Sequence, residues 1–568
     1  MPQDAFTLRY LCEELNLIFA GGKINRITQP NNDEIVLTVY TGKRTEKLLL
    51  NVNPGAPRIG VINEEKESPL TAPNFCMLMR KHLLSATIDS VSLIGFDRIV
   101  RIDLTTSAEF SDAVKKSLYV ELMGRYSNII LTENGKVLGG NRGINMFDNG
   151  VRPLIVNYPY VFPPTQNKKL PDDQTLSDCF SYSSRQDLAQ SVCSLVQGVA
   201  LSTANEIVNG FFDNGVSFSE QNFSKTFYEY LKNYLYNTPK NPCVLFEDGD
   251  VKDVMVAPYA SICGEYKFFE NLYQAEEYYF TERDRVKKFS SKKERLNSVV
   301  SACVKKVKKR LTAISAKERD AESAEENRIK GELILSNVYR IKNGESKCNL
   351  ENYYDGSTVE IELDSRLSPA KNAENYYKKY NKQKRAMSAL KIQREQAQTE
   401  LDYLTGVLDE ISLAENMDDL KMVQAELESV GLMQRQKDVK HKKQAETFCR
   451  VYSVDGFKIL AGRNNSENDK LTFGAKSNDL WLHAKDYHST HVIIQTEGKI
   501  VPEKVLVVAS EITAYYSKGR DGGKTEIVYT ERKNVKKPSK AKPGFVVYDN
   551  FKSLTVEPQK HADFLING

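Results

Sequence analysis

Residues 296–314 read LNSVVSACVKKVKKRLTAI, with five Lys and Arg residues set among apolar side chains. The apolar positions recur at alternating spacings of about three and four, and they are Leu296, Val300, Cys303, Val307, Leu311 and Ile314. A second polar stretch repeats the pattern with Ala397, Leu401, Leu404, Leu408 and Ile411. Heptad-like spacing is typical of helices that pack along one apolar seam. The sequence therefore predicts two long, partnered helices.

The segment between these helices turns the chain round. The run from Ile341 to Gly344 breaks helical periodicity, Val359 to Leu363 alternates like a strand, and Pro369 restarts a helix. A chain that goes out and returns forms an antiparallel coiled-coil arm, and the alternative is a long bundle packed on the body. About 40 residues at 1.5 Å each give an arm of about 60 Å. A narrow arm buries little, in keeping with an apolar content of only 40%.

The 568 residues suggest about four domains, arranged as an α+β multidomain chain. Residues 1–178 predict a mixed N-terminal α/β domain, with strands at 34–40, 99–104 and 127–132 and a helix at 75–84. Residues 179–281 predict a helix-hairpin-helix domain that is mostly helical over about 179–255. Residues 282–445 form the arm with a small strand-containing tip. Residues 446–568 predict a small β-rich α+β domain with a hairpin at Asp455-Gly456.

Residues 195–208 have a helix–hairpin–helix pattern: an apolar helix end, Gly198, a short turn and Ser202 as the cap of the next helix. Backbone N–H groups at such a helix start can hold a phosphate-sized anion. An ordinary helical hairpin with a glycine C-cap fits the pattern equally well.

Charge is segregated although the net charge is only +4. Residues 285–319 contain 13 Lys and Arg against two acids, residues 371–394 contain eight against one, and residues 532–542 contain six and no acid. This distribution puts a positive field on selected surfaces and favours polyanionic partners. The alternative is solvated helix faces and a solubilising tail.

Several classes of protein are disfavoured. No apolar run of about 18 residues occurs, and the start MPQDAFTLRYLCEEL lacks the layout of a secretory signal, so we expect a cytoplasmic protein without a membrane span. Nine scattered cysteines without a CxxC favour free thiols. P-loop, GxSxG and HExxH motifs are missing. His483, His488 and His491 are spaced unlike a helical zinc pair, so we expect no metal and no cofactor.

Two polar motifs stand next to predicted strands. Asp97-Arg98 is either a surface ion pair or a pair that reads an unstacked base. The run ELMGRYSN at 121–128 is either a capped turn or a base-stacking surface. Sequence alone leaves both alternatives open.

Four motifs together resemble the NFACT superfamily, and within it the bacterial ribosome-quality-control members, also described as fibronectin- or fibrinogen-binding proteins. They are GFDR at 95–98, ELMGRYSN at 121–128, SPAKNAENYY at 368–377 and DLWLHAKD at 479–486. The resemblance covers essentially the whole chain in the right order.

The resemblance implies a factor that is not an enzyme. Such proteins bind the 50S ribosomal subunit carrying a stalled peptidyl-tRNA nascent chain and recruit tRNA-Ala. They direct template-free alanine tailing that marks the chain for degradation, while the ribosome makes the peptide bond. The N-terminal domain is similar to that of formamidopyrimidine DNA glycosylases. The arm is expected to reach the stalk base protein on 23S rRNA, and a small S4-domain RNA-binding protein to cooperate.

The resemblance and the charge pattern together give the expected contacts. For tRNA they are Asp97, Arg98, Glu121, Arg125, Tyr126 and Asn128. For rRNA or phosphate they are Gly198, Lys305, Lys306, Lys308, Lys309, Arg310, Trp481, His483, Lys485, Lys536 and Lys537.

This chain departs from the family pattern at three places. Tyr126 stands where His is common, which keeps stacking but removes protonation. His488-Ser489-Thr490 replaces a Pro-Gly-Ser-like turn. Pro2 is followed by Gln3, which cannot act as the acid of a glycosylase. The alternative functions are a surface adhesin for fibronectin, which needs export, and a DNA glycosylase.

Overall fold

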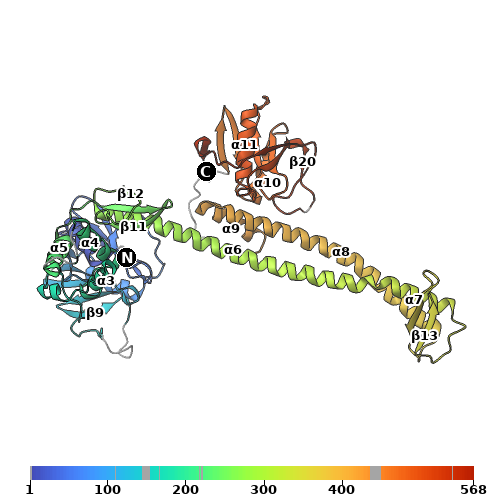
Figure 1. Ribbon diagram of the computed structural model, residues 1–568, viewed down its shortest axis with the longest axis horizontal. Coiled ribbons are helices and arrows are strands. Elements are labelled where there is room, and N and C mark those ends of the chain that lie inside the picture. The colour runs from blue at the N-terminus through green and yellow to red at the C-terminus, as the bar shows by residue number, and fades with distance from the viewer. Residues whose placement is uncertain are drawn as a thin grey trace. The chain divides into compact units, whose positions relative to one another are not determined.

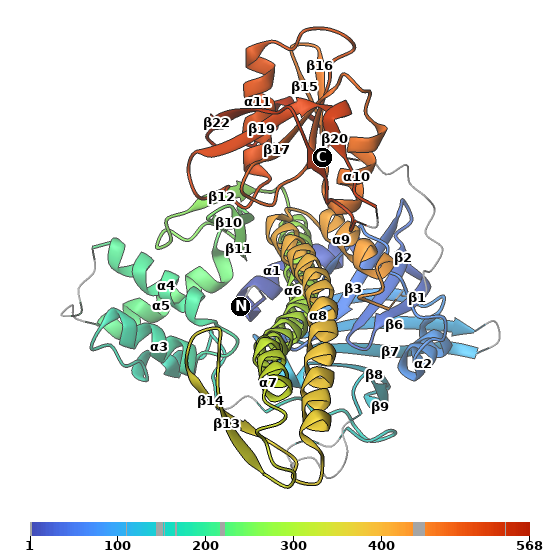
Figure 2. The same cartoon turned by 90° about the vertical axis from the view of Figure 1, so that its right-hand side faces the viewer.

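The computed structural model describes residues 3–108, 111–143, 152, 154–164, 167–215, 218, 222–434, 449–539 and 541–567. The chain forms two compact units, Met1–Val286 and Lys287–Gly568. Pro2 and the predicted boundary at 445/446 lie outside the described residues. The elements of both units are labelled in Figure 1 and Figure 2.

The first unit is built on a nine-stranded sheet of order β4-β3-β2-β1-β5-β6-β7-β8-β9. Its neighbouring strands are antiparallel throughout. The prediction of an α/β domain is therefore wrong, and the domain is α+β. Its consecutive strands are mostly joined by short turns, and a parallel pair would need a long crossover. The strands are β1 (Lys23–Asn31), β2 (Glu34–Tyr40), β3 (Thr45–Asn51), β4 (Arg58–Val61), β5 (Thr87–Leu93), β6 (Ile99–Ala108), β7 (Ser111–Glu121), β8 (Asn128–Glu133) and β9 (Lys136–Gly140).

Helices α1 (Ala5–Phe19) and α2 (Asn74–Leu83) contribute buried side chains to the same core as the sheet. The N-cap of α1 is Asp4, whose carboxylate accepts from the Thr7 N–H at 2.9 Å. The predicted strands at 34–40, 99–104 and 127–132 and the helix at 75–84 match β2, β6, β8 and α2.

A helical layer follows the sheet, in η2 (Gln174–Asp178), α3 (Arg185–Leu195), α4 (Leu201–Asp213) and α5 (Phe223–Asn237). Its apolar side chains join the core of the sheet. A three-stranded sheet comes next, formed by β10 (Cys243–Glu247), β11 (Asp250–Met255) and β12 (Glu265–Phe268). The stretch predicted to be mostly helical, at about 179–255, therefore ends in two strands, and Asp248-Gly249 between them is a strong hairpin signal.

The arm is built as the heptads predict. Helix α6 (Leu272–Glu322) has 51 residues and α8 (Pro369–Leu413) has 45, and both views show them side by side (Figure 1, Figure 2). The predicted seam residues of both helices lie in or against one apolar cluster. Ion pairs Arg310–Glu400 and Arg394–Glu318 set the antiparallel register. Helix α8 alone is about 68 Å long at 1.5 Å per residue.

The tip and base of the arm contain further elements. Helix α7 (Ala324–Ser336) and the hairpin β13 (Lys347–Glu351) and β14 (Thr358–Glu362) form the tip. Ser368 caps α8, and its hydroxyl accepts from the Lys371 N–H. At the base, α9 (Met417–Ser429) packs back on the seam cluster.

The C-terminal domain holds a seven-stranded sheet of order β22-β19-β17-β18-β16-β15-β23. Helix α11 (Glu503–Tyr515) covers one face, and α10 (Asn465–Gly474) lies near the other. The strands are β15 (Arg450–Val454), β16 (Phe457–Ala461), β17 (Leu480–Ala484), β18 (Val492–Gln495), β19 (Thr525–Glu531), β22 (Lys552–Val556) and β23 (Leu565–Asn567). The pair β20 (Val535–Lys536) and β21 (Val547–Tyr548) and the turns η3 (Arg532–Asn534) and η4 (Ala562–Phe564) complete the domain.

All nine cysteines lie within the described residues and are free thiols. Every helix in the described part of the chain is too short or too polar to cross a membrane.

Candidate nucleic-acid interface

Two turns meet at one end of the nine-stranded sheet and place the predicted tRNA contacts together. The turn from β5 to β6 carries Asp97 and Arg98, and the turn from β7 to β8 contains the 3₁₀ turn η1 (Gly124–Tyr126). The Leu122 N–H donates to the Arg98 carbonyl at 2.8 Å, which joins the turns. The sheet register places Glu121 opposite Ile99 on β6. Segments about 25 residues apart in sequence thus form one surface.

The Asp97 carboxylate is held from both sides. Its Oδ1 accepts from the Arg98 N–H at 2.7 Å, and its Oδ2 accepts from Gln197 Nε2 at 2.9 Å. Gln197 lies in the turn between α3 and α4, so the helical layer orients this carboxylate. Asp97 and Arg98 are both half-buried. A carboxylate fixed in this way is pre-oriented to accept from a base amine.

Arg125 and Tyr126 are the exposed members of this surface. Tyr126 is 68% exposed, and the Arg125 guanidinium lies 4.7 Å from the centre of its ring. Gly124 begins the turn with φ +57°, a conformation that glycine adopts without strain. An exposed ring beside a planar cation is suited to stacking on an unpaired base.

Glu121 is buried and paired, which contradicts its prediction as a direct tRNA contact. The side chain is 2% exposed. Its carboxylate accepts from Arg152 at 2.5 and 3.2 Å and from the Tyr160 hydroxyl at 2.7 Å. Burial and the Glu121 charge raise the pKa of Tyr160, so that hydroxyl stays a donor. Glu121 supports the turns from inside.

Asn128 is likewise structural, and the prediction that it contacts tRNA directly is wrong. It is 2% exposed, and its Oδ1 accepts from the Ile129 and Arg142 N–H groups at 2.9 Å each. Arg142, which the sequence reasoning missed, donates in turn to the Arg125 carbonyl at 3.2 Å and to Asp33 at 2.8 Å. These contacts bridge strands far apart in sequence, so no local pattern reveals them.

The predicted anion site at Gly198 is largely filled from within the chain. The N-cap of α4 is Ala200 and not Ser202. Asp4 Oδ2 accepts from the Ala200 N–H at 3.2 Å and from the Thr203 hydroxyl at 2.7 Å. A carboxylate therefore already sits where a phosphate was expected. Gly198 itself has φ +71°, and its backbone packs so closely against Phe96 that an added Cβ would lie 2.2 Å from the Phe96 carbonyl oxygen.

The basic residues of the arm are accessible. Lys305, Lys306, Lys308, Lys309 and Arg310 are all exposed around the buried seam residue Val307. Arg310 is paired with Glu400, so its charge is partly neutralised. The lysines give a charged face that suits phosphate contacts.

Trp481 is a core residue, so its prediction as an RNA contact is wrong. It is fully buried with Ile493, Val528 and Val535. The His483 ring stacks parallel on it with centroids 5.5 Å apart. Burial lowers the pKa of His483 to about 4, so the imidazole is neutral at pH 7.

The predicted lysines of the C-terminal domain differ in how far their charge is neutralised. Lys485 pairs with Glu526 at 3.1 Å, and Lys537 pairs with Asp469. Lys536 is more exposed, with its ammonium 3.9 Å from Asp549. We therefore keep Lys536 as the stronger phosphate candidate of the three.

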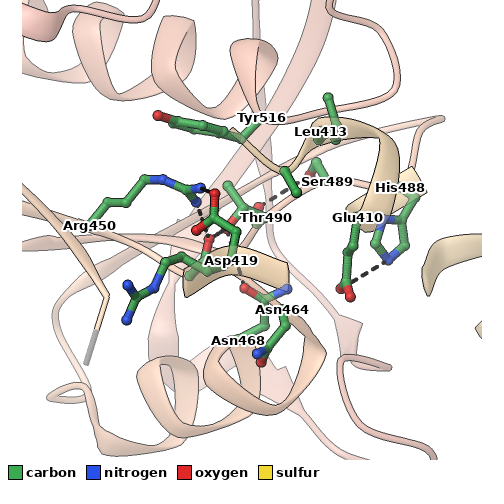
Figure 3. A pocket seen from close by; sticks show the side chains of 13 residues that line it. Glu410, Leu413, Asp419, Arg450, Asn464, Asn468, His488, Ser489, Thr490 and Tyr516 are labelled. Carbon is green, nitrogen blue, oxygen red and sulfur yellow. Dashed lines mark hydrogen bonds and ion pairs between the residues drawn. The ribbon is translucent and has the colours of Figure 1, made fainter. Parts of the chain in front are cut away.

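A polar junction in the second unit joins the base of the arm to the C-terminal domain (Figure 3). Asp419 on α9 and Arg450 on β15 form a buried ion pair at 2.8 Å. Glu410 on α8 faces His488 at 4.0 Å. Burial, and then the charge of Glu426, raise the pKa of Glu410. Burial lowers the pKa of His488.

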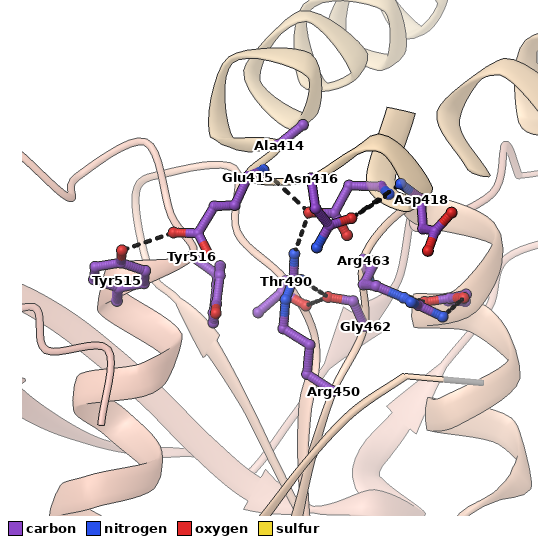
Figure 4. A network of polar contacts seen from close by, with 12 residues as sticks. Ala414, Glu415, Asn416, Asp418, Arg450, Gly462, Arg463, Thr490, Tyr515 and Tyr516 are labelled. Atoms are coloured by element: carbon purple, nitrogen blue, oxygen red, sulfur yellow. Dashed lines mark hydrogen bonds and ion pairs between the residues drawn. The ribbon is translucent and has the colours of Figure 1, made fainter. Parts of the chain in front are cut away.

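Further contacts extend this junction along the α8–α9 connection (Figure 4). Glu415 accepts from the Tyr515 hydroxyl at 2.7 Å, and its N–H donates to Asp419 at 3.1 Å. The Asn416 side chain caps α9 by accepting from two backbone N–H groups. The sequence reasoning missed this junction, because its pairs are formed between separate elements.

In the described part of the chain, no group of three or more His, Cys, Asp or Glu residues is placed to hold a metal ion. His491 Nδ1 and the Thr472 hydroxyl share a hydrogen bond of 2.8 Å, and the His491 ring lies edge-on to Trp481.

Two family models match adjacent parts of the chain, which together cover residues 4–550. One, for the NFACT N-terminal and middle domains, matches residues 4–446. The other, for the NFACT protein RNA binding domain, matches residues 447–550.

Curated relatives align over nearly the full length. The protein "Rqc2 homolog RqcH" of Streptococcus suis (strain 05ZYH33) is 31% identical over 98% of this chain and 98% of that protein. The protein of the same name from Bacillus subtilis (strain 168) is 30% identical over 100% and 99%.

Solved structures match each half of the chain. The N-terminal part of the fibronectin/fibrinogen-binding protein from Streptococcus suis is 24% identical over 49% of this chain and 98% of that one, with a TM-score of 0.43. The C-terminal part is 31% identical over 49% and 99%, with a TM-score of 0.39.

Proposed function

This chain belongs to the NFACT family, and on that premise we propose that it is a ribosome quality-control factor that binds the large ribosomal subunit and holds a tRNA on the paired turns of its N-terminal sheet. The observation that carries the proposal is the combination at that sheet end of an exposed stacking pair, Arg125 and Tyr126, with an immobilised carboxylate, Asp97. Proteins that read single-stranded RNA loops use stacking rings and oriented polar groups in this way.

The finer mechanism is part of the same proposal. The chain recruits tRNA-Ala to a 50S subunit that carries a stalled peptidyl-tRNA, and the ribosome adds alanine to the nascent chain without a template. The chain supplies positioning and no catalytic group, and it acts in the cytoplasm. The lysine-rich face of the arm contacts rRNA near the stalk base, and a small S4-domain protein assists. Exposed lysines at 305–309 support the rRNA contact.

Mass spectrometry of a stalled reporter tests this proposal. A reporter lacking a stop codon is expressed with the wild-type chain, with Asp97→Ala and Arg98→Ala together, or with a control pair. The control is Glu247→Ala with Lys252→Ala, an exposed ion pair elsewhere in the first unit.

Wild type and control should give reporter chains extended by alanine, and the Asp97/Arg98 variant should give none while still sedimenting with 50S subunits. Equal tails from the Asp97/Arg98 variant would disprove the tRNA site. Reporter chains without tails in the wild type would disprove the tailing function.

A further inference from the structure

A cavity of about 190 Å³ lies within the second unit, between the base of α8 and the C-terminal domain. Its walls come from α8, α10, β17 and the loop 542–545, which follows the basic segment. It shares His488, Ser489 and Asn468 with the junction shown in Figure 3. Of the predicted contacts, only His483 lies in its wall.

Four aromatic rings line this cavity: Tyr403, His483, His488 and Phe545. The Tyr403 hydroxyl donates to Glu426 at 2.8 Å, which fixes its ring. His483 is fixed by its parallel stacking on buried Trp481. Phe545 is 51% exposed. The rings of Tyr403 and His483 are thus held in place, and the ring of Phe545 is accessible from solvent.

The polar groups of the wall match the edge and backbone of a nucleotide. The Lys542 ammonium lies 5.7 Å from the Tyr403 ring centre and belongs to the basic run 532–542. Asp402 is exposed, and its Oδ1 accepts from Gln398 at 2.8 Å, which orients the carboxylate. A lysine of this kind suits a phosphate, and a carboxylate accepts from the N–H groups of a base.

The size and charge of the cavity select the class of ligand. Pockets that enclose drug-sized molecules have roughly 300–1,000 Å³, so this cavity takes a single ring system and leaves attached groups outside. The His483 ring is neutral at pH 7 because its pKa is lowered to about 4. A neutral aromatic wall favours stacking, whereas a free phosphate would gain nothing from it.

We infer that this cavity binds one unstacked base of a single-stranded RNA segment, with Lys542 on the adjoining phosphate and Asp402 on an N–H of the base edge. The inference rests on the proposed function, since the RNA-binding role of the domain supplies the polymer. It assigns that role to a cavity that includes the arm residues Asp402 and Tyr403.

The test uses the full-length chain and six single-stranded RNA hexamers, with 2-aminopurine at each position in turn. Stacking of that base in the cavity should quench its fluorescence at one position. Phe545→Ala should remove the quenching and weaken binding about 5- to 150-fold, the range found when one stacking ring is lost. Phe551→Ala is the matched control, since Phe551 is 47% exposed in the same domain and does not line the cavity.

A hexamer that lacks the quenched base completes the cycle. Phe545→Ala should cost nothing further on that hexamer, whereas Lys542→Ala should still weaken binding. Equal binding of every hexamer by Phe545→Ala and Phe551→Ala would overturn the inference. So would a wild-type chain that binds 50S subunits but no hexamer, and both results leave the proposed function standing. Failure of the wild-type chain to bind any RNA would overturn both.

Discussion

Glu121 offers a sharp test, because its burial separates a supporting role from direct recognition. Glu121→Gln removes the charge but keeps the shape, leaving the Arg152 guanidinium, itself 11% exposed, without its counter-ion. Removing one partner of a buried pair costs about 3–5 kcal/mol. We expect a cost at the lower end of this range, about 3 kcal/mol, because the amide oxygen of the introduced Gln still accepts from the Tyr160 hydroxyl. At about 2–4 °C per kcal/mol, a loss of about 3 kcal/mol should lower the thermal transition of the first unit by roughly 6–12 °C.

Differential scanning calorimetry of the full chain measures this shift, with tRNA binding measured well below the transition. Glu13→Gln is the control, because Glu13 is 47% exposed and its pairs with Arg9 and Lys240 are worth less than about 1 kcal/mol. We expect the Glu121 variant to melt early yet bind tRNA at low temperature. An unchanged melting temperature with lost tRNA binding would refute the assignment of Glu121 as a support.

Three further expectations concern stability. Gly198→Ala should lower the melting temperature, because its φ is +71° and the added Cβ would lie 2.2 Å from a backbone oxygen. Gly215→Ala is the control, because Gly215 has φ +84° but open space around it, so this variant measures the cost of the backbone conformation alone. Equal falls in melting temperature for the two variants would contradict the packing argument. Glu410→Gln should raise the free energy of unfolding in urea by on the order of 1 kcal/mol at pH 7.5 and by less at pH 5, because the raised pKa of Glu410 makes its contribution to stability fall as pH rises above about 4.5; an equal gain at both pH values would count against it. The pKa of His483 is lowered, so its contribution to the free energy of unfolding is present above pH 6.5 and is lost as the pH falls towards about 4. His483→Phe should reduce the fall of the urea midpoint over that pH range. An unchanged pH dependence of the midpoint would contradict this expectation.

The elements of this chain could largely be predicted from sequence, because they depend on local periodicity. The seam from Leu296 to Ile314 could be predicted because every third or fourth residue packs against the partner helix. The strand order of the N-terminal sheet was not predicted, although short turns between successive strands are typical of antiparallel pairing.

The site was only half predictable, because burial depends on distant partners. Tyr126 and Glu121 belong to one motif, yet one is exposed and the other is sealed by Arg152. Trp481 was misassigned because both faces of its sheet are covered, so burial along β17 does not alternate. Asp4 fills the helix start near Gly198 from almost 200 residues away, which no spacing rule anticipates.

Sequencing of the RNA that copurifies with the chain tests the central claim most directly. The tagged wild-type chain, the Asp97→Ala/Arg98→Ala variant and the Glu247→Ala/Lys252→Ala control are each recovered from the 50S fraction of a gradient. The account predicts 23S rRNA in all three and one enriched tRNA species, tRNA-Ala, in the wild type and control alone. Random tRNA in every sample, or the same enrichment in the Asp97/Arg98 variant, would contradict it.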